Sequence, residues 1–334
     1  MRVTLVGGLG FIGHHLACEL AGHDVQIIDN LMWNNIVTNA MQPDSFTKRL
    51  NRRFFDLRFE AVQGCLLENV DARDENGLWN ALDRFEPDHI VHLSAISSSV
   101  DARAVPGLCY DLQLNTLKNV LEYARRKGAG VTFLSSSTVY GDFKTPTVDE
   151  SVRPQPVGIY ASTKYMGERL VRCYSDQYGI SSNIIRPSAL YGERCVSRRV
   201  SQVFIENALL GKPLLLEGGG DGRLDFTYIG DLVTGIRLAI EKTSGTNTYN
   251  LTFGHARTIL ELANIVKEVV PEAILEERPR AELKPVRGTL STRRAEEELG
   301  FKARWTLELG YKKYCLWYKE QFDSQEAADR GPHV

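Results

Sequence analysis

Tyr160 and Lys164 are the residues whose types and spacing point most directly to chemistry. They are four positions apart on a predicted helix, so their side chains share one face. A phenol has a pKa of about 10, which is too high for a general base at neutral pH, but a neighbouring ammonium favours the phenolate and lowers that pKa. Ser136 follows the predicted strand 131–135. A serine there can hydrogen-bond the substrate hydroxyl from which Tyr160 would take a proton. These residues predict a catalytic site, although a surface tyrosine beside a lysine and a strand-capping serine would show the same pattern.

A glycine-rich turn near the start of the chain predicts a dinucleotide site. Gly7, Gly10 and Gly13 lie between the apolar run Val3–Val6 and a helical stretch, 11–20. Glycines at this spacing allow a tight turn, close approach of backbone N–H groups to a pyrophosphate, and close helix–strand packing. Asp29 ends the next predicted strand, sixteen residues past Gly13. A carboxylate there can accept both adenosine-ribose hydroxyls and repels a 2′-phosphate, so the pattern favours NAD over NADP.

The elements that must position these residues alternate between strand and helix. This alternation predicts an α/β fold with a Rossmann-type, doubly wound parallel sheet. A stretch at about 31–58 reads as an insertion after the second strand, with a helix inside it. The predicted strands are 2–6, 25–28, 60–63, 89–93, 131–135 and 182–185, and the predicted helices between them include 76–85, 111–127 and 158–178.

The regular alternation ends near residue 186. We therefore predict an NAD-binding domain over 1–185 and a smaller α/β substrate-binding domain over 186–322, with some segments returning to the first domain. Helices are expected at 259–270 and 293–299. The polar, small-residue stretch 323–334 is expected to be a disordered tail.

Composition argues against several classes of protein. The 334 residues carry a net charge of −2, which offers no basic field for nucleic acid. No apolar run reaches the roughly 20 residues of a membrane helix, and the first predicted strand begins at residue 2, which leaves no room for a signal peptide. The six cysteines show no metal-ligand spacing. We expect a cytoplasmic protein with reduced thiols, no metal, and no nucleic-acid or membrane partner.

Taken together, the motifs resemble those of the extended short-chain dehydrogenases/reductases of the nucleotide-sugar epimerase and dehydratase group. The similarity runs from residue 2 to about 318. Its motifs are the glycine-rich turn, Asp29-Asn30-Leu31, Asp71-Ala72-Arg73-Asp74, His92-Leu93-Ser94-Ala95, Ser135 to Gly141, Tyr160 with Lys164, Arg186-Pro187 with Tyr191-Gly192, and Asp225-Phe226-Thr227-Tyr228 with Asp231-Leu232.

The resemblance implies tightly held NAD and a nucleotide diphosphate-sugar substrate, most commonly a UDP-sugar. It also implies a homodimer paired through the helices 111–127 and 158–178. Leu114, Leu117, Leu121 and Ala124 form an apolar stripe on the first of these helices, which either meets a partner or faces the sheet. The implied cofactor-binding residues are Gly7, Gly10, Phe11, Ile12, Gly13, Asp29, Asn30, Leu31, Asp71, Ala72, Leu93, Ser94, Ala95, Gln113, Ser135, Tyr160, Lys164 and Pro187.

The substrate residues are less regular than in the family. Gln113 aligns with a usual asparagine, and Leu224 stands where an arginine is expected, with Arg223 before it. Val286 aligns with a pocket position that limits the substituent at sugar C2. The predicted substrate-binding residues are Ser97, Ser136, Ser137, Thr138, Arg194, Arg223, Arg280 and Val286, and Arg198, Arg199, Arg278 and Arg287 are further candidates for a diphosphate or a uronate carboxylate.

The residues four, three and two positions before Tyr140 discriminate between reactions within the group. The dehydratases resemble Thr-Asp-Glu there, and the glucuronate decarboxylases resemble Thr-Ser-Glu, whereas this chain has Ser136-Ser137-Thr138. This difference favours 4-epimerisation of a UDP-hexose or UDP-hexuronic acid through a 4-keto intermediate. The alternatives are a 4-keto-sugar reductase and another NAD-dependent NDP-sugar enzyme, a dehydratase or decarboxylase. A non-catalytic NAD sensor is disfavoured, because both Tyr160 and Lys164 are present.

Overall fold

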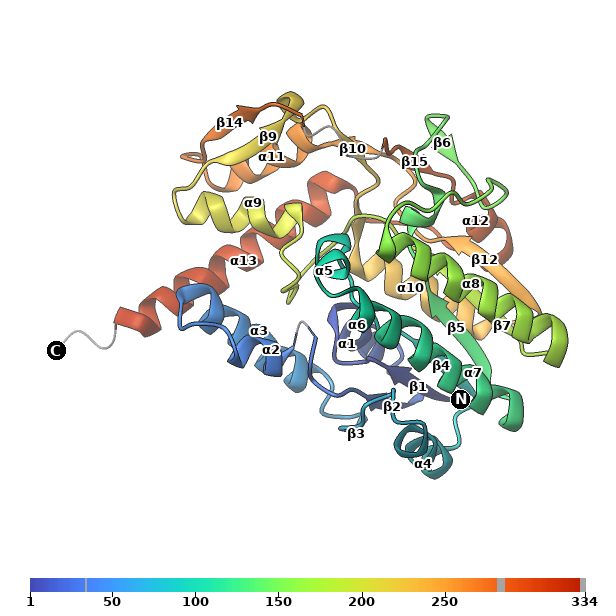
Figure 1. The fold of residues 1–334 in the computed structure, drawn as a ribbon. Coiled ribbons are helices and arrows are strands. Elements are labelled where there is room, and N and C mark those ends of the chain that lie inside the picture. Colours follow the sequence, from blue (N-terminus) through green and yellow to red (C-terminus); the bar gives the residue numbers. More distant parts are fainter. Residues whose placement is uncertain (34, 281–285, 331–334) are drawn as a thin grey trace.

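A seven-stranded parallel sheet forms the centre of the protein in a computed structural model that describes residues 1–33, 35–280 and 286–330 (Figure 1). The strand order is β12-β7-β5-β4-β1-β2-β3. The chain therefore starts in the middle, builds outward to one edge, returns to the centre and builds toward the other edge, as a doubly wound fold does. The strands are β1 Arg2–Val6, β2 Asp24–Ile28, β3 Leu66–Glu68, β4 His89–His92, β5 Gly130–Leu134, β7 Ser182–Arg186 and β12 Thr246–Asn250.

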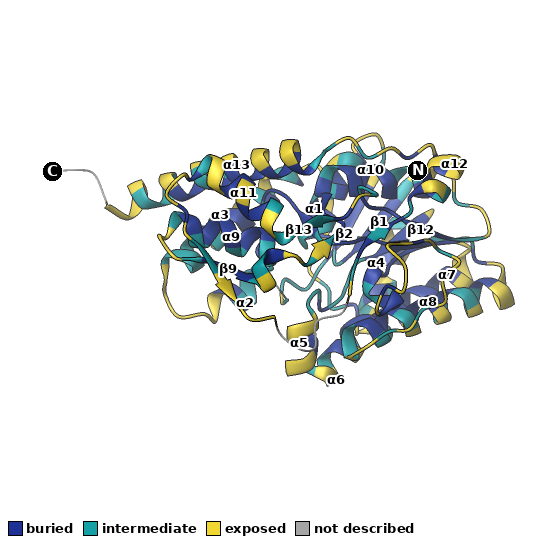
Figure 2. Cartoon of the chain, turned by 90° about the horizontal axis from the view of Figure 1, so that it is seen from above, coloured by how far each residue is buried: buried dark blue, intermediate teal, exposed yellow. Residues whose placement is uncertain are grey.

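Helices cover both faces of this sheet, which confirms the predicted fold class (Figures 1 and 2). Alternate side chains of one strand enter different cores: Leu5 packs on one face and Val6 on the other. The cluster that contains Leu5 includes helices α1 (Phe11–Glu19) and α10 (Ile229–Glu241), and the cluster that contains Val6 includes α4 (Glu75–Phe85), α7 (Thr116–Lys127) and α8 (Ile159–Tyr178).

The apolar stripe of α7 faces the sheet. Leu117, Leu121 and Ala124 are completely buried within the single chain, in the same core cluster as Val131 and Phe133 of β5. Of the two explanations left open by the sequence, the structure supports packing on the sheet. Leu114, the first residue of the stripe, is only partly buried.

The predicted insertion folds as two helices, α2 (Ile36–Ala40) and α3 (Phe46–Ala61). The strand predicted at 60–63 is wrong, because α3 runs through Ala61 and β3 begins only at Leu66. Phe54 and Phe55 bury the inner face of α3, whereas β3 is an exposed edge strand with Leu66 48 % exposed. An edge strand defined by its backbone pairing with β2 carries no buried apolar pattern in its sequence.

The remaining segments form a smaller α/β part above the carboxyl end of the sheet. Short strand pairs and helices α9 and α11 build it, while α12 packs on α10 and β12. Its elements are β8 Leu190–Tyr191 with β11 Thr227–Tyr228, β9 Leu214–Glu217 with β14 Leu275–Arg278, β10 Arg223–Leu224 with β13 Arg257–Thr258, β6 Thr147–Val148 with β15 Thr289–Leu290, α9 Val200–Leu209, α11 Ile259–Val269 and α12 Arg293–Leu299.

The last helix, α13 (Leu307–Arg330), joins the two parts of the molecule. It packs on α9 and α11 of the smaller part and on α3 of the insertion (Figure 1). Residues 323–330, expected to be disordered, continue this helix, and Asp329 forms an ion pair with Arg49 of α3 at 2.9 Å. Residues 331–334 of the predicted tail lie outside the described residues.

Candidate active site

The glycine-rich turn has the geometry that its spacing predicts. Gly7 has a φ of +81°, and a Cβ there would lie 2.8 Å from the backbone nitrogen of Ser94. A Cβ at Gly13 would lie 2.4 Å from the carbonyl oxygen of Gly8, so only glycine lets α1 pack against the turn. No side chain caps the start of α1 at Gly10. Its first N–H groups are therefore available for an anion.

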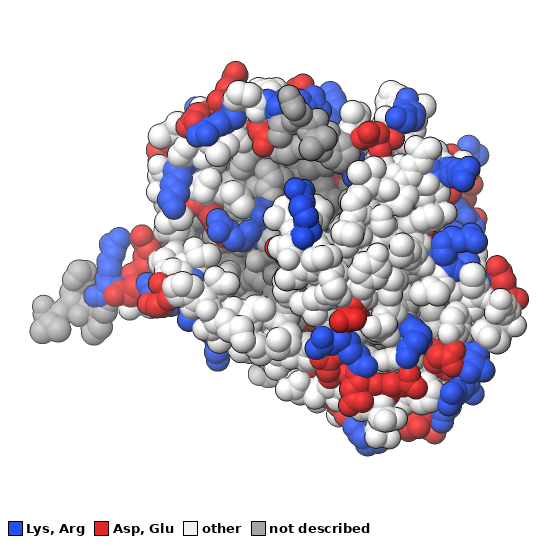
Figure 3. All heavy atoms as spheres, viewed as in Figure 1, with Lys and Arg blue, Asp and Glu red and all other residues white. Residues whose placement is uncertain are grey.

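A cavity of about 420 Å³ lies between this turn, the ends of β4 and β5, the start of α8 and the smaller part of the molecule. In the space-filling view the surface is hollowed between the two parts of the chain, with basic side chains around the hollow (Figure 3). The predicted site residues that line the cavity are Gly7, Gly10, Phe11, Ile12, Gly13, Leu93, Ala95, Ser97, Ser135, Ser136, Ser137, Thr138, Tyr160, Lys164 and Pro187.

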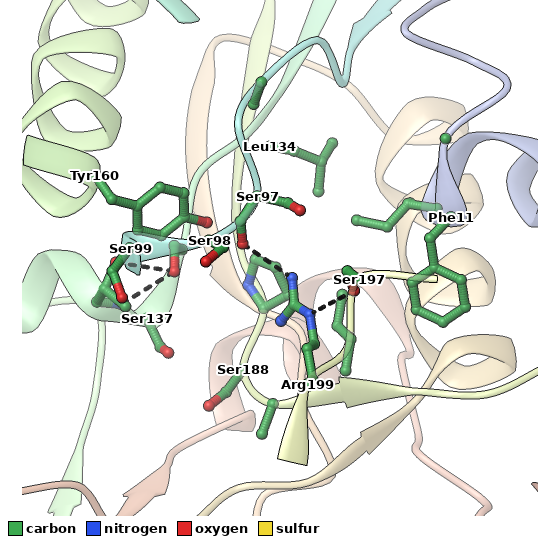
Figure 4. A pocket seen from close by; sticks show the side chains of 18 of the residues that line it. Phe11, Ser97, Ser98, Ser99, Leu134, Ser137, Tyr160, Ser188, Ser197 and Arg199 are labelled. Atoms are coloured by element: carbon green, nitrogen blue, oxygen red, sulfur yellow. Dashed lines mark hydrogen bonds between the residues drawn. The ribbon is translucent and has the colours of Figure 1, made fainter. Parts of the chain in front are cut away.

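Tyr160 and Ser136 meet in this cavity, as predicted. Burial raises the pKa of the Tyr160 phenol, while the positive charge of Arg199 and a hydrogen bond with Ser136 lower it. Arg199 lines the same cavity, and its guanidinium donates to the carbonyl oxygen of Ser97 (3.2 Å) and to the hydroxyl of Ser197 (3.3 Å; Figure 4). The cation that favours the phenolate in this structure is thus Arg199, whereas the sequence pointed to Lys164.

Lys164 lies one helical turn after Tyr160 and is also part of the cavity wall. Its ammonium donates to the carbonyl oxygen of Leu134 at 2.6 Å and lies over the ring of Phe133. Burial lowers the pKa of this ammonium to about 8. The Leu134 carbonyl at the end of β5 takes one of the three N–H donors of this ammonium, so two remain for a ligand hydroxyl.

The residues predicted to hold the adenosine lie outside the cavity, at the carboxyl ends of β2 and β3. The Asp29 carboxylate accepts hydrogen bonds from the backbone N–H groups of Leu9 (2.9 Å) and Leu31 (2.8 Å), and burial raises its pKa. Asn30 donates to Asp71 at 3.1 Å, which ties the two strand ends together. Each carboxylate oxygen of Asp29 keeps a free lone pair, so the carboxylate can still accept two ribose hydroxyls. Ala72, Ser94 and Leu31 also lie outside the cavity lining.

Gln113 is not in the cavity wall. It lies in a π-helical turn, Asp111–Asn115, and its amide donates to the sulfur of Cys109 (2.8 Å) and to the hydroxyl of Thr163 (2.9 Å). The amide thus braces this turn against α8, one residue before Lys164. Cofactor binding by Gln113 stays a prediction.

Four predicted substrate residues also lie outside the cavity lining. Arg194 points to His15 on the other side of the turn, Arg223 donates to the carbonyl oxygen of Ala256, and Arg280 pairs with Asp221. Val286 is 53 % exposed. Side-chain directions in loops do not follow a helical or strand period, so the sequence did not separate these arginines from the three that line the cavity, Arg198, Arg199 and Arg287.

Two more basic residues belong to the wall: Arg287, a further candidate from the sequence, and Arg58, which the sequence did not single out. Arg287 donates to the carbonyl oxygens of Gly141 (2.9 Å) and Ser137 (3.3 Å), and burial lowers its pKa. Arg58 comes from the insertion helix α3 and is 1 % exposed. Within the described part of the chain, the lining contains these basic groups and no Asp or Glu. The cavity is therefore suited to an anionic ligand.

In residues 1–33, 35–280 and 286–330, no helix combines the length and apolar character needed to cross a membrane. The same residues contain no group of three or more His, Cys, Asp or Glu side chains that could hold a metal ion.

The chain belongs to the NAD dependent epimerase/dehydratase family, whose pattern matches residues 3–252. A putative UDP-glucose 4-epimerase of Methanocaldococcus jannaschii is 29 % identical over 330 residues, covering 95 % of this chain and 98 % of that protein. UDP-glucuronic acid decarboxylase 2 of Arabidopsis thaliana is 30 % identical over 320 residues, 93 % of this chain and 66 % of that protein.

The solved structure of the Thermus thermophilus UDP-glucose 4-epimerase in complex with NAD superimposes with a TM-score of 0.81, at 26 % identity and over 96 % of this chain and 99 % of that one. These relatives include enzymes of different reactions, so they show the family and leave the reaction open.

NAD is the cofactor of this family, and the residues of this chain fit it. The uncapped start of α1, which follows the glycine-rich turn, offers the N–H groups of its first turn to a pyrophosphate. Asp29 offers carboxylate oxygens at the end of β2. Lys164 and Tyr160 line the far end of the same cavity.

Proposed function

We propose that this protein inverts the configuration at C4 of a nucleotide diphosphate-sugar, a UDP-hexose or a UDP-hexuronic acid, through a 4-keto intermediate. The observation that carries the proposal is the set of groups beside Tyr160. They are the hydroxyls of Ser136, Ser137 and Thr138, which are all part of the cavity wall. Alcohol oxidation and reduction need a base and a hydrogen-bonding partner, which these residues supply.

Each residue has a defined task in this scheme. The Tyr160 phenolate accepts the proton of the sugar 4-hydroxyl, and the Ser136 hydroxyl hydrogen-bonds the same oxygen. Lys164 holds the nicotinamide ribose through its remaining donors. NAD, when bound, supplies the hydride acceptor at C4 and later the hydride donor. On the return, Tyr160 gives its proton back to the 4-keto oxygen.

Inversion requires the hydride to return to the opposite face of the sugar, so the 4-keto sugar must turn within the cavity. The enzyme therefore needs a strong hold on the diphosphate and a weak hold on the sugar. We assign the strong hold to Arg198, Arg199 and Arg287, whose guanidiniums suit phosphate oxygens. Ser97 and Ser188 also line the cavity, and their short side chains leave room for the sugar (Figure 4).

Incubation of the purified protein with UDP-hexoses, UDP-hexuronic acids and dTDP-hexoses, without added cofactor, tests the proposal. We expect NMR to show inversion at C4 of one substrate, with no loss of water or carbon dioxide. Loss of either from the product, or stoichiometric consumption of added NADH, overturns it in favour of a dehydratase, a decarboxylase or a reductase. Tyr165→Phe is the matched control for Tyr160→Phe, since Tyr165 lies on the same helix and outside the cavity lining.

We further propose that the protein is a cytoplasmic homodimer. Helix α8 supports this assembly, because its Met166 (43 %) and Tyr178 (51 %) expose large apolar side chains. Light scattering after size exclusion tests the assembly, and a monomer at micromolar concentration contradicts it.

A further inference from the structure

A completely buried arginine lies beneath the glycine-rich turn. Arg58 projects from α3 of the insertion, is 1 % exposed, and forms part of the cavity wall. Its guanidinium also lies over the ring of Phe55 at 5.1 Å. Removing a charged group from water is costly unless the protein supplies hydrogen-bond partners for it, so the partners of this arginine determine what it does.

Those partners join two segments that are far apart in the sequence. Arg58 Nη1 donates to the carbonyl oxygen of Leu9, in the glycine-rich turn, at 3.2 Å. Nη2 and Nε of the same guanidinium donate to the carbonyl oxygen of Arg194 at 2.6 and 3.2 Å. One side chain therefore links the turn to the loop that follows β8.

The turn is held from both sides of Leu9. Its N–H donates to the Asp29 carboxylate at 2.9 Å, and its carbonyl oxygen accepts from Arg58 and, at 3.4 Å, from the amide of Asn35. The Leu9 carbonyl shares a peptide group with the N–H of Gly10, which donates to the carbonyl oxygen of Gly7 at 3.2 Å, so these contacts fix the turn directly before the first N–H groups of α1. Asn35 and Arg58 both belong to the insertion, so the insertion supports the cofactor-binding turn.

The loop that follows β8 contains two arginines of the cavity wall, Arg198 and Arg199. Arg194 has a φ of +62° and Arg198 a φ of +46°, both in the left-handed region that a non-glycine residue adopts only when its surroundings hold it there. Arg58 holds the carbonyl group of Arg194, and Gln202 accepts from the N–H of Arg198 at 3.0 Å. This backbone carries Arg198 and Arg199 to the cavity wall.

The charge of Arg58 also matches the expected ligand. Arg58 donates to the carbonyl oxygens of Leu9 and Arg194, and the nearby Asp29 carboxylate favours its charged form. Burial lowers the pKa of Arg58 to about 10, so it stays protonated at neutral pH. A buried positive charge in the wall beside the turn stabilises a pyrophosphate that binds there.

We infer that Arg58 is a positioning residue that fixes the glycine-rich turn and the loop 194–199 in one arrangement, so that dinucleotide binding and nucleotide-sugar binding both depend on it. The part concerning the dinucleotide rests on the family's cofactor. The part concerning the second ligand rests on the proposed function.

The test compares Arg58→Met, Arg58→Lys and the control Arg52→Met. Arg52 is on the same helix, is exposed and pairs with Asp56 at 3.2 Å, so its removal changes charge without touching the turn. Lysine keeps the charge at position 58 but lacks the planar fork that reaches two carbonyl groups. Isothermal titration measures the dissociation constant of NAD, and then that of UDP on the NAD-loaded protein, with thermal unfolding recorded for each variant.

We expect Arg58→Met to weaken NAD binding at least about tenfold and UDP binding severalfold, with Arg58→Lys intermediate, because hydrogen bonds from charged donors are lost. Arg52→Met should stay within about twofold. The inference is overturned if folded Arg58→Met binds NAD as the unaltered protein does, including when only its melting temperature falls. Should Arg58→Met fail to fold, Arg58→Lys decides: unchanged NAD and UDP affinities overturn the inference, and weakened ones support it. Failure of UDP to bind any variant counts against the proposed function and leaves the NAD comparison intact.

Discussion

Neutralising Arg199 should move the pH dependence of turnover to higher pH. Burial raises the pKa of the Tyr160 phenol, and the Arg199 charge is the largest influence that lowers it. In the proposed scheme Tyr160 acts as a base only when it is deprotonated, so activity should rise as the pH rises through this pKa. Arg199→Met removes the charge that favours the phenolate. The pKa therefore goes up, and less of the base is active at neutral pH.

The size of the shift follows from a single nearby charge. An opposite charge within a few ångströms lowers the pKa of a group by about 1–3 units, and solvent reduces that effect. Arg199 is only partly buried and donates to Ser97 and Ser197, so we take the low end of this range. The midpoint should rise by about one pKa unit, which is about a tenfold loss of kcat at pH values below it.

The assay is the pH profile of kcat at saturating nucleotide-sugar. Arg199→Lys keeps a positive charge and should leave the midpoint nearly unchanged, and Arg199→Met should recover most of its activity at alkaline pH. Arg198→Met is the matched control, because Arg198 lines the cavity and pairs with Glu206 without being among the influences on the pKa of Tyr160. An Arg199→Met profile with an unmoved midpoint, or one reduced equally at every pH, refutes the reasoning.

Three further predictions concern other parts of the molecule. Tyr160→Phe should abolish turnover and leave the NAD content of the purified protein unchanged; an active variant ends the catalytic scheme. Glu168→Gln leaves the buried guanidinium of Arg186, now bonded to it at 2.6 and 2.9 Å, without its counter-charge, and should cost about 3–5 kcal/mol of unfolding free energy by urea titration; a loss under 1 kcal/mol contradicts this. Burial lowers the pKa of His89 to about 4, below its value of 6.5 in the unfolded chain, so stability falls as pH drops from 6.5 toward 4. Between pH 7.5 and 5, His89→Gln should lose about 2 kcal/mol less than the unaltered protein, and parallel losses would exclude this role.

The local motifs could be predicted from the sequence because neighbouring residues determine them. Glycine spacing sets the turn before α1, and the i, i+4 spacing of Tyr160 and Lys164 brings both to one cavity. The periodic segments at 76–85 and 158–178 became α4 and α8 nearly as expected. These features depend on backbone conformation over a few residues.

Other features depend on contacts between distant segments. The exposed strand β3 is defined by its backbone pairing with β2. Helix α13 extends to Arg330 because it packs on α3, where Asp329 pairs with Arg49. Neither β3 nor the end of α13 has the periodic apolar pattern that a buried strand or helix shows in its sequence. For this reason the strand predicted at 60–63 and the disorder predicted for residues 323–330 were wrong.

The sequence by itself determined the family, the glycine-rich turn and the placement of Tyr160 and Lys164 on one helix face, since each is carried by residue types at short, regular spacing. Only the tertiary structure decided which arginines meet the cavity. Arg194 and Arg199 are five residues apart in one irregular loop, yet one faces His15 and the other the cavity beside Tyr160. Their directions follow from left-handed backbone at Arg194 and Arg198 and from the buried guanidinium of Arg58, a residue from a distant helix. No periodicity encodes such an arrangement, because packing between segments creates it.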